Sequence, residues 1–330
     1  MIESAVDVPF RGLLPELVLQ LAERAGLQPD GRLFALNSYE NRVYRLGRDD
    51  AAPLVLKFYR AGRWSDAQVL EEHEFALELA AAELPVVAPI ALGSSTLHKA
   101  QGFRMAAFEL RSGAAPELDH ADARAQLGRA MARIHAYGAR RPFRYRIRID
   151  NAWLGARARN VVLASSWLPD HCRSRYESVS QQLVVAISEQ WQQCTDLHMI
   201  RLHGDCHLGN ILWNAQGPLF VDLDDCLMGP AIQDLWMFLS GSGDEQRRQW
   251  RDLIEGYEQF VDFDYQQLQL IEALRAARML NYAAWLAERW RDPAFPRAFP
   301  WFSEANYWER HTSDLAEQIN AVTHPPILTM

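Results

Sequence analysis

Residues 202–213 read LHGDCHLGNILW, and residues 219–225 read LFVDLDD. An acid, Asp205, is predicted to stand on a loop, and an amide, Asn210, follows five residues later. A second acid, Asp222, comes directly after a short apolar strand, beyond a predicted hairpin turn. Carboxylate and amide oxygens are ligands that Mg²⁺ prefers in proteins, together with substrate phosphates. Because the protein's part in phosphoryl transfer is mainly positioning and charge neutralisation, the spacing is typical of a phosphotransferase.

Each part of this pattern has a simpler interpretation. The acidic run at 222–225 could be a solvated turn, and the tripeptide ending at Asp205 could belong to any loop. His203 and His207 could ligate zinc, although the glycines nearby argue against a helix that would align them. His207 is also a rival to Asp205 as a base. The combination is more specific than its parts and favours phosphoryl transfer.

A resemblance to a known family rests on these residues. His-Gly-Asp-x-x-x-x-Asn followed by Val-Asp-x-Asp-Asp resembles the aminoglycoside phosphotransferase and choline kinase superfamily, which shares the protein-kinase fold. Residues 36–44, 57–60, 201–213, 222–225 and 229–236 are similar, more narrowly, to bacterial Ser/Thr protein kinases of the stress response. The resemblance implies an α+β, two-lobed fold. The small N-terminal lobe would be an antiparallel sheet with one long helix, and the larger C-terminal lobe would be mostly helical.

The same resemblance implies roles for individual residues. Asp205 would be the proton acceptor, Asn210 and Asp222 the magnesium ligands, and Ser38 a position that touches ATP. Asp222 would also count among the catalytic residues. Asp234 matches an acid that anchors the catalytic loop through its backbone, or it could be an acid that complements a helix N-terminus. The implied cofactor and co-substrate are Mg²⁺ and ATP.

A lysine, Lys57, stands near the end of a predicted strand at 54–59. In a kinase-like lobe such a lysine contacts the α- and β-phosphates and pairs with an acid on a helix, although it could also be a solvated residue. The helix predicted after Ser65 offers Glu71, Glu72 and Glu74 as partners. We predict Glu72, because it precedes Phe75 by three residues and so shares the apolar face.

The loop expected to cover the phosphates, residues 37–41, reads NSYEN and contains no glycine. The way in which a glycine-rich loop binds phosphate in protein kinases therefore cannot be assumed for this loop. Backbone N–H groups and the Ser38 hydroxyl could still bind phosphate here. Adenine is expected near residues 108–110, where plain core packing is the alternative.

The predicted secondary structure differs between the two parts of the chain. Residues 1–110 are predicted to be the nucleotide-binding lobe, with strands near 42–46, 54–59 and 103–110 and a helix running to about Glu83. Residues 111–330 are predicted to be the catalytic and acceptor-binding lobe. Its predicted helices include 122–136 and 178–193.

Charge and composition exclude several classes of protein. The 330-residue chain has a net charge of −8, which argues against a nucleic-acid partner. One basic run, residues 140–148, could contact RNA or an acidic substrate, but we interpret it as a solvated connector. The four cysteines show no CxxC spacing, residues 1–7 lack a basic start, and no run of about twenty apolar residues occurs. We therefore expect a cytoplasmic monomer with no membrane partner.

Three functions compete on this pattern. The first is a kinase that phosphorylates the Ser or Thr hydroxyl of a protein substrate. The alternative is a kinase of small alcohols, such as an aminoglycoside, choline or homoserine. A catalytically dead binding module is disfavoured, because the candidate residues are intact. An enclosed pocket for a small alcohol could be lined by tryptophans of the C-terminal helices. These are Trp285, Trp290, Trp301 and Trp308.

Overall fold

The computed structural model describes residues 9–325, which fall into two compact units. Unit 1 comprises the chain up to Pro116, together with Arg144–Arg146 and Gly209–Asp224. Unit 2 comprises Glu117–Phe143, Ile147–Leu208 and the chain from Asp225 onward. Residues 1–7, which entered the expectation about localisation, lie outside the described residues.

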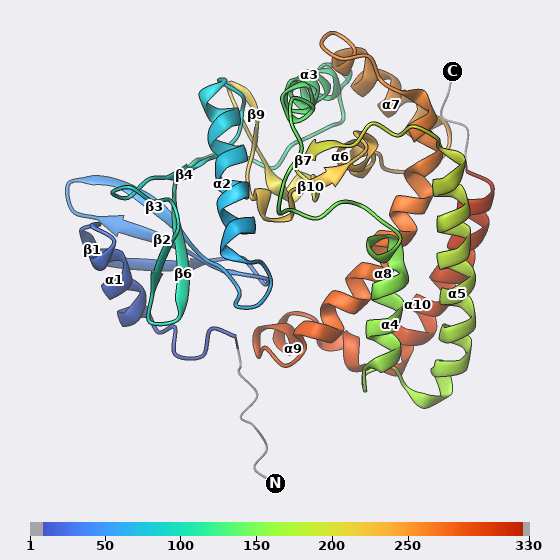
Figure 1. The fold of residues 1–330 in the computed structure, drawn as a ribbon, viewed down its shortest axis with the longest axis horizontal. Helices are drawn as coiled ribbons and strands as arrows, with labels where there is room; N and C mark the ends of the chain where they lie inside the picture. Colours follow the sequence, from blue (N-terminus) through green and yellow to red (C-terminus); the bar gives the residue numbers. More distant parts are fainter. Residues whose placement is uncertain (1–8, 326–330) are drawn as a thin grey trace. The chain divides into compact units, whose positions relative to one another are not determined.

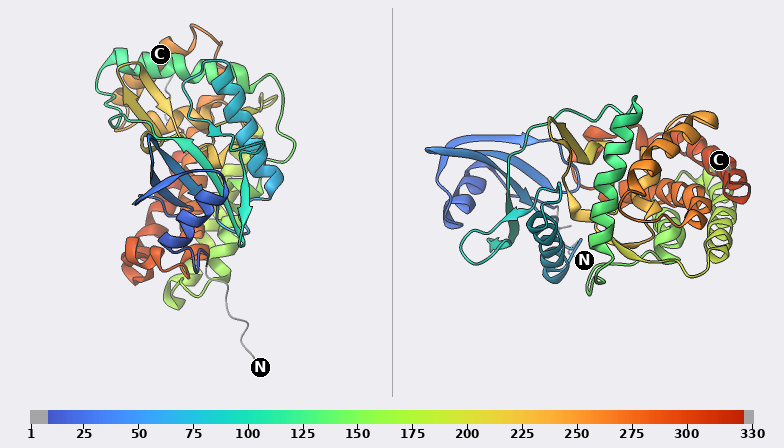
Figure 2. Two further views of the ribbon diagram at one scale, coloured as in Figure 1. Left: turned by 90° about the vertical axis from the view of Figure 1, so that its left-hand side faces the viewer. Right: turned by 90° about the horizontal axis from the view of Figure 1, so that it is seen from above.

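Unit 1 is built on an antiparallel sheet of six strands, in the order β1-β2-β3-β6-β4, with β5 paired to β6 (Figure 1). Helix α1 (Pro15–Arg24) packs its apolar face on this sheet, where Val18 and Leu21 join a core that includes Leu56 and Phe58. Both views of Figure 2 show this dark-blue helix beside the blue strands. The strands are β1 (Pro29–Leu36), β2 (Arg42–Arg48), β3 (Ala51–Phe58), β4 (Pro89–Ile90), β5 (His98–Ala100) and β6 (Phe103–Glu109).

Helix α2 (Asp66–Ala81) follows the third strand and begins with a capping box. The Ser65 hydroxyl accepts the backbone N–H of Gln68, and the Gln68 side chain accepts the backbone N–H of Ser65. Two backbone donors that the helix itself leaves unpaired are thereby satisfied. The predicted long helix is confirmed, and it ends two residues before the expected Glu83.

A short hairpin, β8 (Ile211–Asn214) and β9 (Gly217–Phe220), also belongs to unit 1. It is attached by an isolated bridge between Val86 and Phe220 and by another between Ala114 and Trp213. The predicted hairpin between the two acids is confirmed.

Unit 2 is mainly helical and contains one small sheet, β7 (Ile200–Leu202) paired with β10 (Leu227–Gly229). Helices α3 (Ala121–Gly138) and α7 (Asp244–Tyr257) can approach closely because residue 128 is glycine. A Cβ at this position would stand 2.0 Å from the Leu253 carbonyl oxygen. Helices α5 and α10 run side by side (Figure 1). The longer helices are α3 (Ala121–Gly138), α4 (Arg157–Ala164), α5 (Asp170–Gln193), α7 (Asp244–Tyr257), α8 (Ile271–Arg289) and α10 (Ala305–Thr323). Shorter helices are α6 (Ile232–Leu235) and α9 (Ala294–Ala298).

The α+β prediction is confirmed, with two differences in unit 2. Helix α5 begins at Asp170, eight residues before the predicted start at Ser178, because the arginine-rich first turns hide the apolar periodicity. Helix α4, together with the wide turn at Ala152–Ala156, was not predicted. Within residues 9–325, no helix combines the length and the apolar character that crossing a membrane requires.

Candidate active site

The predicted catalytic loop, residues 203–207 of unit 2, is held by the carboxylate of Asp234. Its two oxygens accept the backbone N–H groups of His203 and Gly204, each at 2.8 Å. Asp234 is fully buried, and Nε2 of His135 lies 3.2 Å from it. Gly204 has a φ of +88°, and a Cβ there would stand 2.0 Å from the Asp225 carbonyl oxygen. The path of the loop is therefore fixed by backbone bonds and requires glycine.

Asp205 follows this anchor, with a side chain that is 28% exposed. The guanidinium of Arg278, on α8, donates to Oδ1. The Nε2 atom of His207 lies 3.5 Å from Oδ2. Burial would raise the pKa of Asp205, but the hydrogen bond from His207 and the charge of Arg278 lower the pKa below its usual value. An ionised carboxylate that is partly open to solvent can serve as a proton acceptor.

Asn210 and Asp222 flank the open end of the β8–β9 hairpin in unit 1. The Asn210 carbonyl accepts the backbone N–H of Val221 at 3.0 Å, one step beyond the Ile211–Phe220 pair. The hairpin thus brings the predicted metal-binding residues to the same end of two strands. Asp222 has a φ of +60°, a left-handed conformation that is uncommon outside glycine and often marks a functional site.

Lys57 is buried on β3 and points its ammonium at three carboxylates. Its Nζ atom lies 2.7 Å from Asp222, 3.4 Å from Asp224 and 3.6 Å from Glu72. Burial alone would lower the pKa of Lys57, but these three acids raise the pKa well above its usual value. Lysine therefore stays charged inside unit 1, beside an acid, Asp222, whose side chain is half exposed.

Glu72 reaches Lys57 because α2 turns its apolar face inward, with Val69, Phe75 and Leu79 buried on the same side. Burial raises the pKa of Glu72 to about 7, against the opposing charges of Lys57 and Arg146. Of the other two acids considered on this helix, Glu71 instead accepts the backbone N–H groups of residues 144–146.

Arg146 was not predicted to have a role, and its position corrects the interpretation of residues 140–148 as a solvated connector. Its guanidinium is fully buried and donates to Glu72 at 2.7 Å, to the Asp224 carbonyl at 2.6 Å and to the Gln68 carbonyl at 2.8 Å. The only signal in the sequence was the alternation of arginine with apolar residues, which is typical of a half-buried strand.

Asp224 is a further member of this cluster and is buried. Burial would raise its pKa, but Lys57, Arg63 and Arg146 lower the pKa below its usual value. The Asn41 amide donates to Oδ2 at 3.1 Å, and the Arg63 guanidinium donates to the same oxygen. The sequence showed Asp224 only as part of a motif, and neither Asn41 nor Arg63 carried a signal beyond its polar loop.

Ser38 is half-buried in the loop that contains no glycine, and its hydroxyl donates to the Asn41 carbonyl at 3.3 Å. At its other end the loop is fixed by Asn41, whose side-chain oxygen accepts the backbone N–H of Arg60 at 3.1 Å. Side-chain hydrogen bonds therefore shape this loop where glycine does so in protein kinases.

The tryptophans expected to line an acceptor pocket divide into two pairs. Trp290 and Trp308 are buried among other rings of unit 2, so the expectation is wrong for them. Trp285 and Trp301 are partly exposed, and both pack on Phe299.

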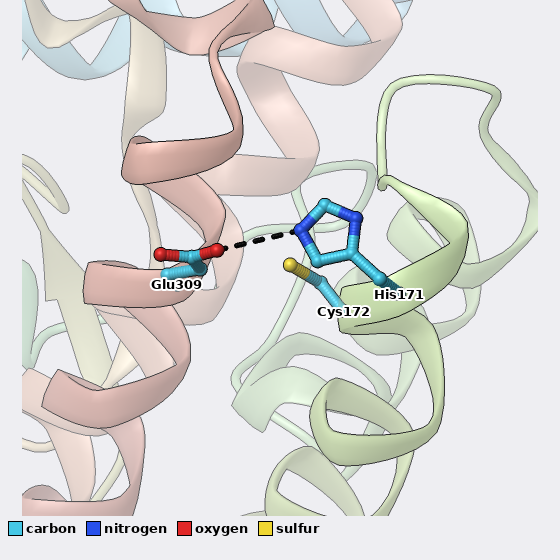
Figure 3. A group of neighbouring side chains, drawn as sticks. All are labelled: His171, Cys172 and Glu309. Carbon is cyan, nitrogen blue, oxygen red and sulfur yellow. Dashed lines mark ion pairs between the residues drawn. The ribbon is translucent and has the colours of Figure 1, made fainter.

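A group of possible metal ligands lies elsewhere in unit 2. Figure 3 shows His171 and Cys172, at the start of α5, facing Glu309 on α10. Among the described residues it is the one group of three or more such side chains, and it contains neither His203 nor His207. Imidazole and thiol ligands suit softer metals than Mg²⁺. The ion pair of His171 with Glu309, at 3.4 Å, accounts for the closeness of these side chains.

Comparison with known proteins defines the class of this chain. It belongs to the phosphotransferase enzyme family, whose profile matches residues 33–271. Stress response kinase A of Salmonella choleraesuis (strain SC-B67) is 44% identical over 318 residues, which are 96% of each chain. Serine/threonine protein kinase RdoA of Salmonella typhimurium is also 44% identical, with the same coverage. The chain is therefore an ATP-dependent kinase.

A solved structure confirms the kinase-like fold. Amicoumacin kinase hAmiN, solved in complex with AMP-PNP, Ca²⁺ and Ami, is 17% identical and superposes with a TM-score of 0.72. The match covers 95% of this chain and 94% of the other.

Proposed function

We propose that this chain is a Mg²⁺- and ATP-dependent Ser/Thr protein kinase of the bacterial stress response. We assign nucleotide binding to the lobe predicted at residues 1–110, and catalysis and acceptor binding to the lobe predicted at residues 111–330. The observation that carries the proposal is the buried ammonium of Lys57, in contact with three carboxylates. A buried cation among acids, one of them half exposed and in a left-handed conformation, is typical of a functional site.

On the nucleotide side, Lys57 binds the α- and β-phosphates of ATP, and Ser38 contacts the phosphates from its loop. Glu72, whose carboxylate lies 3.6 Å from the ammonium, would hold Lys57 in place if Asp222 served as a metal ligand instead. Arg146 supports this arrangement, because it donates to Glu72 from a fully buried position. Two cations thus share Glu72, which limits the cost of burying its charge.

Asn210 and Asp222 are the residues that would hold Mg²⁺. An amide oxygen and a carboxylate oxygen are the hard donors that this ion prefers, and both residues stand at one end of a hairpin. When bound, the ion neutralises negative charge on the phosphates during transfer.

Asp205 is the catalytic base. Its carboxylate accepts the proton of the Ser or Thr hydroxyl as that oxygen forms its bond to the γ-phosphorus, and the bond from the γ-phosphorus to the leaving ADP oxygen breaks. The bonds from Asp234 to the loop backbone keep this carboxylate in place during the reaction. Positioning of this kind is what the protein contributes to phosphoryl transfer.

We place the enzyme in the cytoplasm as a monomer. All four cysteines are free thiols, which suits a reducing compartment.

The test is transfer of the radiolabelled γ-phosphate of ATP to generic protein substrates, beside a panel of small alcohols that includes aminoglycosides, choline and homoserine. We expect label on Ser or Thr of protein, dependent on Mg²⁺ and lost in Lys57→Ala. Efficient labelling of a small alcohol with none of protein would assign the enzyme to the small-molecule kinases. ATP binding without any turnover would contradict both.

A further inference from the structure

Arg278 is the cation that touches the proposed base. It lies on α8, within unit 2, and its Nη1 atom donates to Oδ1 of Asp205. The arginine side chain is 46% exposed. On the other side of the carboxylate, Nε2 of His207 lies 3.5 Å from Oδ2. The base is therefore flanked by two basic side chains, one on its own loop and one on a helix.

The two neighbours differ in the donors that they offer to the carboxylate. A guanidinium is a rigid planar fork of N–H donors, whereas an imidazole is a ring with two nitrogens. Arg278 is therefore the neighbour better suited to fix the plane of the Asp205 carboxylate. It also projects from a long helix whose inner residues, such as Leu274 and Leu280, are fully buried, so its backbone is a firm support.

We propose that Arg278 is a positioning residue for Asp205, and that its guanidinium holds the carboxylate in the one orientation from which it accepts the proton of the acceptor hydroxyl. The inference rests on the proposed function, since it assumes that Asp205 is the base. Bond formation to the acceptor oxygen is weak in a loose phosphoryl-transfer transition state, so correct geometry matters more than a strong base. A misplacement of about 1 Å can cost about 10²-fold in rate.

The experiment compares Arg278→Ala and Arg278→Lys with a matched control, Arg275→Ala. Arg275 stands about one turn earlier on α8, where it pairs with Glu272 at 3.1 Å and lies over the Trp236 ring. We expect Arg278→Ala to lower kcat by about 10²-fold, with an unchanged affinity for Mg²⁺-ATP by calorimetry. Arg278→Lys should recover part of the loss, because it restores charge without the planar fork. Arg275→Ala should keep kcat within two-fold of wild type.

Chemical rescue separates positioning from support of the helix. Guanidinium chloride at ~20 mM, far below the molar concentrations that unfold proteins, should restore kcat of Arg278→Ala several-fold. It should not restore Asp205→Asn, which has lost the carboxylate that guanidinium would hold. A loss in Arg278→Ala that guanidinium does not restore, or that comes with weaker Mg²⁺-ATP binding, would overturn the inference. A rise in kcat would also overturn it, because Arg278 would then be blocking the base.

Asp205→Asn, assayed in parallel, keeps this inference distinguishable from the proposed function. If Asp205→Asn retains full transfer, Asp205 is not the base and the proposed function of the loop fails. If Asp205→Asn is inactive while Arg278→Ala turns over within two-fold of wild type, only the inference fails. In the double variant, Arg278→Ala should add no further loss to Asp205→Asn, as expected of two residues that act as a unit.

Discussion

The catalytic loop of unit 2 and the cluster of charged side chains around Lys57 in unit 1 are both organised around buried carboxylates. The bonds that these carboxylates accept differ between the two regions. Asp234 accepts two backbone N–H groups, so it fixes the path of the chain. Asp224 and Glu72 are paired with side-chain cations, namely Lys57, Arg63 and Arg146. A bond to the backbone cannot be exchanged without refolding the loop, whereas an ammonium can change partners when a ligand arrives. The loop is thus built for rigidity, and the cluster is suited to exchange its partners.

Asp222 tests the cluster and should show the largest effect. Asp222→Asn keeps a residue type that tolerates a left-handed backbone but removes the charge of the proposed metal ligand. We expect turnover to fall by more than about 10³-fold, since interactions of this kind act on the charge that develops in transfer. The free energy of unfolding should change by less than about 1 kcal/mol, because the Asp222 side chain is half exposed. Transfer assays, magnesium-nucleotide binding and thermal melts measure the three quantities.

The control for this variant is Asp196→Asn, an exposed acid that also has a positive φ, of 58°. It should leave turnover unchanged. Near-wild-type turnover of Asp222→Asn at ordinary magnesium concentrations would contradict the metal-binding role.

Asp205 tests the chemistry of the loop. Asp205→Asn can still hold the acceptor hydroxyl but cannot take its proton, so kcat should fall by about 10²–10⁴-fold. Affinity for Mg²⁺-ATP by calorimetry should stay nearly unchanged. A loss of both would make Asp205 a metal ligand or a structural residue. Greater damage from His207→Ala than from Asp205→Asn would assign the base to the histidine.

Asp234 tests the rigidity of the loop. Asp234→Ala leaves the buried N–H groups of His203 and Gly204 without their acceptor, at a cost of about 1–3 kcal/mol for each group. We expect the free energy of unfolding, measured with urea, to fall by roughly 3 kcal/mol and turnover of the folded enzyme to be largely lost.

A matched control for Asp234 is Asp252→Ala. Asp252 is also a buried acid of unit 2, but its carboxylate pairs with the Arg124 side chain, at 2.7 Å. The Asp252→Ala variant should have a lower free energy of unfolding than wild type, while its folded form keeps the kcat of wild type. Equal kcat in the two variants would show that the backbone bonds of Asp234 do not position the base.

The sequence predicted the strands and helices that carry the site better than it predicted the pairs of charged side chains within the site. Three elements of the site follow from local sequence patterns. Alternation of apolar residues predicted the strand that carries Lys57, and an N-cap predicted the start of the helix that carries Glu72. A turn predicted the hairpin between Asn210 and Asp222. Arg146 and Arg278 were missed, because each meets its acid across more than seventy positions of chain. Long-range pairing of this kind has no local period, and an arginine in a basic run or on a helix is ordinarily solvated.

Glu72 gives the smallest effect and a pH dependence with a definite sign. Its pKa is raised on folding from a usual value near 4.5 to about 7. A carboxyl whose folded pKa is raised binds its proton more tightly in the folded protein, so its contribution favours folding at low pH and is lost as pH rises through 7.

Glu72→Gln removes this titration. We therefore expect the unfolding free energy of wild type to decline, relative to Glu72→Gln, between about pH 4.5 and pH 7. Urea titrations across this range measure the difference, with Glu71→Gln on the same helix as the control. A difference that is flat with pH, or that grows in favour of wild type, would show that Lys57 and Arg146 keep Glu72 ionised throughout, and that the cluster is held as firmly as the loop.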